Sequence, residues 1–278
     1  MKTGCLIYSD NLKYKKLHDC AVKSFSKFNP DVEVYSVDYQ HEASLPNSNI
    51  PAGVFKYTLA AEIFDSYNLD KIIILGADTI TCSRLDEFLD DNSNDILATL
   101  DYPYSLKVNN NQHLSNRENH INADVVCFNN VQALKDIINL WTNFKTSYYE
   151  QACLNYIVNV EKKYKSKIVD GDYDNSDVVY NARAKGNLTA EANCKPWPKY
   201  TNLFEVKNNK LFTGTHEYVS KTKQIKVWHY CDGLGTQSYE NFSSIINSWI
   251  DNGFNNQTKS FFTNNCCCGD FFNKEFKI

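Results

Sequence analysis

The chain alternates between short apolar runs and longer segments in which apolar residues recur at helical spacing. The short runs are typical of buried strands and lie at residues 5–9, 32–37, 71–75, 96–100, 122–128 and 224–230. Apolar residues three or four positions apart predict helices at residues 17–28, 54–67, 131–144, 149–160 and 238–250. This alternation predicts an α/β fold with a mostly parallel sheet flanked by helices.

Two kinds of segment interrupt this alternation. Residues 203–212 predict a smaller antiparallel hairpin that turns at Asn208 and Asn209. Polar and irregular sequence at residues 101–119 and 170–199 predicts long loops, which in compact domains are often functional.

The composition supports one domain with a sizeable core, because 42% of the 278 residues are apolar and 16 Phe and 18 Tyr are among them. We expect this domain to span residues 1–252 and to be followed by a Cys- and Phe-rich tail over residues 253–278. The tail contains Cys266-Cys267-Cys268, and three adjacent cysteines do not match the C-x(2–4)-C spacing of zinc sites. We therefore expect a peripheral tail at this end and no zinc site.

Charge and hydropathy narrow the classes of partner. The net charge of -4 provides no basic field of the kind that nucleic-acid-binding proteins use. No apolar run approaches the ~20 residues that a transmembrane helix needs. The apolar stretch near residue 5 is also too short for a signal-peptide core of ~7–15 residues. We expect no nucleic-acid partner, no transmembrane segment and a cytoplasmic location.

Acidic side chains follow three of the predicted strands. Asp10, Asp78 and Asp101 each lie just beyond an apolar run. Sheets of this type bind ligands at the carboxyl ends of their strands. Asp78 is the strongest candidate of the three, because its carboxylate could hold a hard cation there. The alternative is an aspartate that caps a helix or stabilises a loop.

His229 lies at the end of another predicted strand and precedes a segment that contains Gly233 and Gly235. An imidazole followed by a glycine-rich loop can supply a metal ligand and backbone N–H groups for phosphate. Since His229 and Asp78 each follow an apolar run, we expect them to meet at the same edge of the sheet. The alternative for His229 is a partly buried histidine before a turn.

Three further polar residues are candidates on helices. Glu150 and Gln151 place a carboxylate and an amide at the start of one helix, where capping is the alternative role. Lys56 lies on the helix that leads to the strand before Asp78, and a solvated surface lysine is the alternative there.

Together these features resemble an ordered set of known motifs. Residues 7–10, 21–25 and 29–31 resemble a first strand, helix and second strand, and residues 55–80 resemble a helix leading to a Leu-Asp-Ala-Asp-Thr metal motif. Residues 122–125 resemble Asn-Ala-Gly-Val, residues 150–155 resemble Asp-Gln-Asp-x-Leu-Asn, and residues 229–231 resemble the start of His-x-x-Gly-x-x-Lys-Pro-Trp. Over roughly residues 4–235 the chain is therefore similar to glycosyltransferase family 8, the retaining enzymes that include glycogenin and bacterial lipopolysaccharide galactosyltransferases.

The resemblance implies a single GT-A type, Rossmann-like domain that binds a UDP-sugar and a manganese or magnesium ion. The metal ligands would be Asp78 and His229, and Glu150 and Gln151 would flank the anomeric carbon. The nucleotide and diphosphate would contact Tyr8, Ser9, Asp10, Tyr14, Lys56, Gly76, Ala77, Asp78, Gly233 and Gly235. The donor sugar and acceptor would be lined by Asp101, Asn122, Ala123 and Asp124, with Lys56 facing the diphosphate or the sugar.

The chain departs from these motifs at three places. Gly76 stands where the family has the first Asp of its metal motif, Asp124 replaces a Gly, and the closing Lys-Pro-Trp is missing after Gly233. Gly76 and the missing Lys favour the alternative of a sugar-nucleotide-binding relative with little or no transferase activity. A nucleotidyltransferase is a further alternative, but the segment 9–12 lacks the glycine-rich basic loop expected there.

The expected reaction is transfer of a hexose from a UDP-sugar to a hydroxyl of a glycan, a lipid-linked sugar or a protein. The sugar leaves through an oxocarbenium-like state while negative charge grows on the diphosphate. A divalent metal would stabilise that charge as a Lewis acid. Because neither Glu150 nor Gln151 is a convincing covalent nucleophile, we favour front-face transfer with retention and with the departing phosphate as base.

Overall fold

A computed structural model describes residues 1–9, 14–38, 52–100, 121–144, 149–169, 178–183, 204–213, 223–229 and 238–253. Four predicted site residues, Asp10, Asp101, Gly233 and Gly235, lie outside these ranges, as does the triplet Cys266–Cys268. The chain divides into two compact units, each assembled from separate segments. Unit 1 comprises residues 1–12, 31–76 and 85–171, and unit 2 comprises residues 13–30, 77–84 and 172–278.

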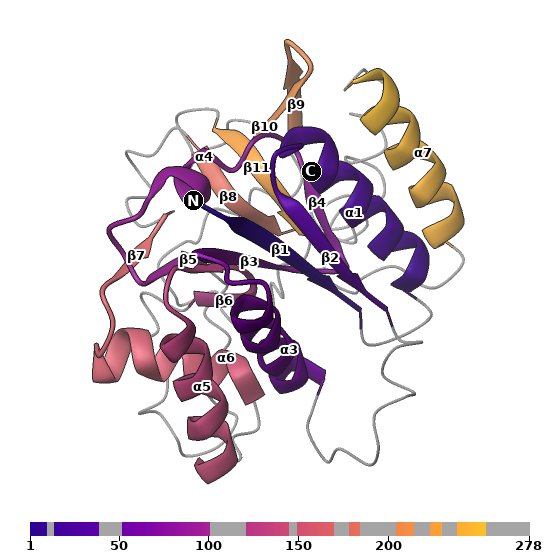
Figure 1. The fold of residues 1–278 in the computed structure, drawn as a ribbon. Helices are drawn as coiled ribbons and strands as arrows, with labels where there is room; N and C mark the ends of the chain where they lie inside the picture. The colour runs from indigo at the N-terminus through magenta and orange to yellow at the C-terminus, as the bar shows by residue number, and fades with distance from the viewer. Residues whose placement is uncertain are drawn as a thin grey trace, which may run out of the picture. The chain divides into compact units, whose positions relative to one another are not determined.

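Unit 1 is built on a six-stranded sheet with the order β2-β1-β3-β6-β5-β7 (Figure 1). Its strands are β1 (Thr3–Tyr8), β2 (Glu33–Val37), β3 (Lys71–Gly76), β5 (Ile96–Leu100), β6 (Ile121–Phe128) and β7 (Ser166–Ile168). Strand β1 is parallel to both of its neighbours, and β5 is parallel to β7. Strand β6 is antiparallel to β3 and β5.

Three helices share one face of this sheet, namely α3 (Ala52–Ser66), α5 (Val131–Phe144) and α6 (Tyr149–Asn155) (Figure 1). Because side chains alternate along a strand, every second residue of β1, β3 and β6 points toward these helices. Leu6, Ile72, Ile74, Val126 and Phe128 form the sheet side of this core and are fully buried. Helix α6 continues into a π-helical turn, Tyr156–Glu161, and π-helical turns often lie at functional sites.

Strand β6 is irregular where it passes β5. Ala98 pairs with Val126, whereas Leu100 pairs with Ile121, so a two-residue step in β5 faces a five-residue step in β6. The β6 strand therefore carries a bulge of three extra residues. Bulges re-aim side chains and are common next to active sites.

Unit 2 contains a second sheet in the order β4-β11-β10-β9, with β8 paired to β11. Its strands are β4 (Thr79–Thr81), β8 (Val178–Arg183), β9 (Phe204–Lys207), β10 (Lys210–Thr213) and β11 (Gln224–His229). The predicted hairpin is confirmed as β9–β10. It turns at Asn208 and Asn209, which have φ of 50° and 58°, as a type I′ turn requires.

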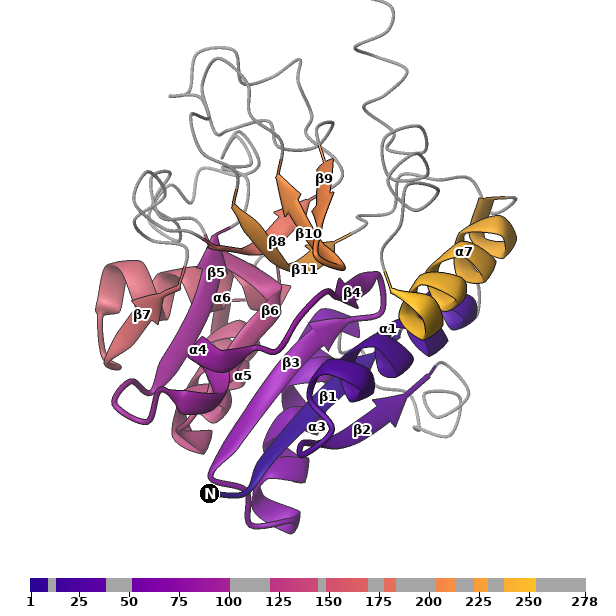
Figure 2. The same ribbon diagram turned by 90° about the horizontal axis from the view of Figure 1, so that it is seen from above.

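Two helices of unit 2, α1 (Lys15–Phe28) and α7 (Ser238–Asn252), lie side by side (Figure 2). The rings of Phe28 and Trp249 stack with centroids 6.2 Å apart, and Lys23 pairs with Asp251 at 2.9 Å. Gly253 directly follows helix α7 and terminates it. Its φ of 84° suits glycine, and its N–H donates to the carbonyl of Trp249.

The predicted α/β class, with its largely parallel sheet and separate antiparallel element, is confirmed. The antiparallel element is larger than the hairpin expected from the sequence, and β8 lies within the segment 170–199 that was expected to be irregular. The end of the main domain at residue 252 stays a prediction. Within the described residues, no helix combines the length and apolar character needed to cross a membrane.

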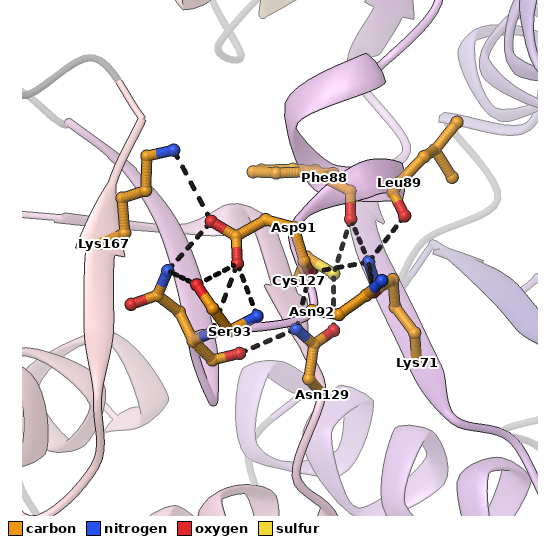
Figure 3. Close-up of polar contacts among 10 residues, drawn as sticks. Lys71, Phe88, Leu89, Asp91, Asn92, Ser93, Cys127, Asn129 and Lys167 are labelled. Atoms are coloured by element: carbon orange, nitrogen blue, oxygen red, sulfur yellow. Dashed lines mark hydrogen bonds and ion pairs between the residues drawn. The ribbon is translucent and has the colours of Figure 1, made fainter. Parts of the chain in front are cut away.

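A cluster of polar contacts in unit 1 surrounds the buried Lys71 (Figure 3). The Lys71 ammonium donates to the carbonyls of Phe88 and Leu89 in the short helix α4 (Asp86–Asp90) and of Asp91 just beyond it, at 2.5, 2.8 and 2.9 Å. Burial lowers the pKa of Lys71, but three carbonyl acceptors favour the charged form.

Asp91 belongs to the same cluster. Burial alone would raise the pKa of Asp91, yet hydrogen bonds from Ser93 and Asn94 hold it at about 2. This cluster fixes the connection between α4 and β5.

We expect Lys71→Met to lower the free energy of unfolding by about 1–3 kcal/mol, because it leaves buried carbonyl acceptors without a donor. Urea unfolding monitored by circular dichroism measures this. Lys167→Met is the matched control, since Lys167 reaches the same cluster at 3.5 Å from Asp91 but is half exposed. A Lys71→Met variant as stable as the control would contradict a stabilising role of the hydrogen bonds from Lys71 to these carbonyls.

Candidate active site

Asp78 and His229 form a pair within unit 2. The Oδ1 atom of Asp78 lies 3.2 Å from Nε2 of His229. Asp78 directly precedes Thr79, and Thr79 pairs with His229 in the antiparallel contact of β4 with β11. The two residues therefore meet as predicted, but not at one edge of the parallel sheet, because β11 belongs to the second sheet.

This pair fits a divalent metal ion. Two neighbouring ligands on an octahedral ion with bonds of ~2.1 Å lie ~3 Å apart, which is close to the separation observed. A carboxylate suits manganese or magnesium, whereas an imidazole suits transition metals, so this pair of ligands fits manganese better than magnesium. No group of three or more His, Cys, Asp and Glu that could hold a metal occurs among the described residues. An ion held here would therefore need oxygen ligands from a substrate or water.

A second polar cluster lies within unit 1. The Lys56 ammonium on α3 contacts the carboxylate of Asp124 on β6 and lies 3.5 Å from Oε1 of Glu150 on α6. The Lys56 side chain is only 4% exposed, whereas those of Asp124 and Glu150 are 35% and 12% exposed. The structure therefore brings together three predicted site residues from three elements, and it rejects the alternative of a solvated Lys56.

Burial and charge act in opposite directions on this cluster. Desolvation would lower the pKa of Lys56, but the charges of Asp124 and Glu150 outweigh it and raise that pKa, so the lysine stays protonated. The pKa of Glu150 is raised, chiefly by burial, although the charge of Lys56 opposes the change. The neighbouring Tyr57 hydroxyl has a strongly raised pKa for the same reason and donates to the carbonyl of Ala123 at 3.3 Å.

Because Gly53 has no side chain, it leaves room for the Glu150 carboxylate. A Cβ atom on Gly53 would lie 1.9 Å from Oε2 of Glu150, so the carboxylate packs directly on the first turn of α3. Negative charge is stabilised at the N-terminus of a helix, where backbone N–H groups lack partners within the helix. Gly53 was not among the predicted site residues. The sequence offered one signal that Gly53 belongs to this cluster, because it lies three residues before Lys56.

Two amide side chains of α6 hold the bulged part of β6. Oε1 of Gln151 accepts from the N–H of Ala123 at 3.3 Å. Asn155, one turn later on the same face, accepts from the N–H of Ile121 and donates to its carbonyl, both at 2.9 Å. Oδ1 of Asn122 accepts from the N–H of Asp124 at 2.8 Å. These bonds replace the strand contacts that the bulge removes.

Asn155 is therefore a positioning residue that the sequence analysis did not assign. We expect Asn155→Ala to lower the free energy of unfolding by about 2–4 kcal/mol, because both backbone groups of Ile121 lose their partner in a fully buried place. Chemical unfolding measures the change.

Asn252→Ala is the matched control, because Asn155 and Asn252 each donate to the carbonyl four residues earlier, Gln151 and Ser248, but Asn252 is exposed. The control is expected to change stability by less than about 0.5 kcal/mol. Equal effects in the two variants would show that Asn155 contributes no more than a helix-surface asparagine.

The predicted nucleotide-binding residues are divided between the units. In unit 1, Tyr8 pairs with Gly76 across β1 and β3, is 5% exposed and packs against Phe55 with centroids 5.9 Å apart. Ser9 is buried and its N–H bonds to the carbonyl of Val37. In unit 2, Tyr14 directly precedes α1 and Ala77 directly precedes Asp78. Their roles toward a nucleotide stay predictions.

No protein-family profile and no curated protein sequence matches this chain. The solved structures that resemble it in fold include three glycosyltransferases. A glycosyltransferase involved in the glycosylation of the major capsid of PBCV-1 is 12% identical with a TM-score of 0.53, over 88% of this chain and 100% of its own. An active-site mutant of LgtC, with glutamate in place of a glutamine, is 16% identical with a TM-score of 0.50, over 87% and 95%.

The third structure, the bifunctional glycosyltransferase WbbM without ligand, is 14% identical with a TM-score of 0.51. That alignment covers 94% of this chain and 51% of WbbM. At such low identities the likeness concerns the arrangement of helices and strands. The chain thus has the fold of these glycosyltransferases.

Proposed function

We propose that this protein is a retaining glycosyltransferase that moves a hexose from a UDP-sugar to a hydroxyl acceptor and uses a divalent metal ion. The observation that carries the proposal is the 3.2 Å pair of Asp78 and His229, on a chain with a glycosyltransferase fold. The order of motifs that resembles glycosyltransferase family 8 supports the same conclusion.

Asp78 and His229 would hold the ion through Oδ1 and Nε2. When bound, a divalent cation supplies Lewis-acid stabilisation for the charge that develops on the diphosphate. His229 is 2% exposed, so its ring has little freedom to turn away. With two protein ligands in place, metal affinity depends on the nucleotide, and binding should be weak without UDP and much tighter with it.

Glu150 and Gln151 would act on the donor sugar. The Glu150 carboxylate is fixed by Lys56 and by its contact with Gly53, so it meets the sugar without further reorganisation. Neither residue is proposed as a covalent nucleophile. The acceptor hydroxyl attacks the anomeric carbon from the face that the diphosphate leaves, and its proton passes to the departing phosphate.

Gln151→Ala is expected to lower kcat far more than it weakens UDP-sugar binding, because a group that acts in the transition state leaves ground-state binding largely intact. Steady-state kinetics and calorimetric binding give the two values separately. Gln132→Ala is the control, since the Gln132 amide makes an exposed contact with Asp136. Equal losses in turnover and binding would instead indicate that Gln151 only holds Ala123.

A thermal-shift screen with manganese tests the donor. Ligand stabilisation reports affinity directly, so the UDP-sugars should give larger shifts than GDP- or CMP-sugars. GDP-mannose as the strongest ligand would overturn the donor assignment. Stabilisation by UDP-sugars without hexose transfer or hydrolysis would instead identify a sugar-nucleotide-binding protein. This is the main alternative function, because Gly76 replaces an Asp of the family's metal motif.

A further inference from the structure

Lys56 forms ion pairs with two carboxylates. Its ammonium contacts Asp124, lies 3.5 Å from Glu150, and its side chain is 4% exposed. When all three groups are ionised, one positive charge meets two negative charges and the cluster carries a net charge of about −1. Even when Glu150 is protonated, no positive charge is left over for a ligand.

Asp124 is the member of the cluster that a ligand can reach most easily. Its side chain is 35% exposed, compared with 12% for Glu150 and 4% for Lys56. The bulge in β6 and the bond from the N–H of Asp124 to Asn122 position its backbone, and the contact with Lys56 holds its carboxylate. An ionised carboxylate only accepts hydrogen bonds, so it attracts hydroxyl groups and repels a second carboxylate.

We propose that Asp124 selects an uncharged donor sugar, a neutral hexose in preference to a uronic acid. This inference rests on the proposed function, because it takes the donor sugar to lie against the cluster. A hexose offers hydroxyl donors to Asp124. A uronic acid brings a carboxylate to a place where the nearby cation is already neutralised, so its binding is weakened by repulsion and by the loss of water.

Calorimetric titration of the full chain with UDP, UDP-glucose and UDP-glucuronate, each with manganese, tests the inference. Wild-type protein should bind UDP-glucuronate at least about tenfold more weakly than UDP-glucose. In Asp124→Asn, which keeps the shape and removes the charge, the difference should shrink to about threefold or less. Asp65→Asn is the matched control, because it removes the partner of Lys135 on the surface of the same unit and should keep the wild-type ratio.

The outcomes separate the inference from the proposed function. Equal affinity of the wild-type protein for UDP-glucose and UDP-glucuronate overturns the inference even if Asp124→Asn does not fold, and leaves the proposed function standing. An unchanged ratio in folded Asp124→Asn shows that another group selects the sugar and also overturns it. Failure of all three ligands to bind the wild-type protein overturns the proposed function and the inference with it.

Discussion

Replacing either Asp78 or His229 with alanine is expected to abolish metal-dependent activity, with a loss of at least about 100-fold in kcat. The reason is that, in the proposed metal site, the two side chains lie 3.2 Å apart and act as one unit, so that one ligand alone would not hold the ion. The double variant should therefore be little worse than either single variant. Hexose release from a UDP-sugar, measured with and without manganese, gives the comparison.

Asp19→Ala is a matched control for this pair. Asp19 also lies near a histidine of unit 2, at 3.8 Å from Nδ1 of His18, and its side chain is 58% exposed. This variant should keep full activity. Full activity in His229→Ala, or tight manganese binding by the wild-type protein in the absence of nucleotide, would contradict the proposed metal site.

The second large effect is expected from Lys56→Met. This change leaves Asp124 and Glu150 beside each other without a cation, and breaking a buried ion pair in this way lowers stability by about 3–5 kcal/mol. The loss should shrink as the pH falls, because the raised pKa of Glu150 lets it take up a proton earlier than an exposed glutamate does. Urea unfolding at several pH values measures both effects.

Two further variants make this prediction sharper. Lys135→Met removes an ion pair with Asp65 at 2.7 Å that is 43% exposed on the lysine side, and should lower stability by less than about 1 kcal/mol. Adding Asp124→Asn and Glu150→Gln to Lys56→Met removes the uncompensated charges and should recover most of the loss. A Lys56→Met variant no less stable than Lys135→Met would show that the cluster does not depend on a buried cation.

The sequence predicted much of the fold because its longer elements have clear patterns. The apolar run before Gly76 and the helical spacing after Ala52 correspond to β3 and α3. The short strand β4 has only three residues, which is too few to show a pattern, and its pairing with β11 brings Asp78 to His229. The prediction that the two residues meet is confirmed, whereas the expected reason, a shared edge of one parallel sheet, is wrong.

The sequence predicted which residues belong to the candidate site but not how their side chains are arranged. Motif order singled out Lys56, Asp124 and Glu150, but a linear pattern does not show that one ammonium lies between two carboxylates from different elements. Asn155 follows Gln151 by four residues and so shares its helix face, which was a visible signal. Its task depends on the bulge in β6, and that irregularity comes from tertiary pairing.

Gly76 is the departure that lies within the motif resembling the family's metal motif. Among the described glycines only Gly253 has a positive φ, so the backbone at Gly76 accepts other residues without strain.

Incubation of the full chain with manganese and a series of UDP-hexoses labelled in the sugar is the direct test of metal-dependent hexose transfer. We expect the label to leave UDP, to water or to a hydroxyl acceptor, only when a divalent metal is present, and we expect Asp78→Ala to remove this activity. Labelled donors that stay intact while bound, or cleavage that leaves the hexose attached to phosphate, would contradict it.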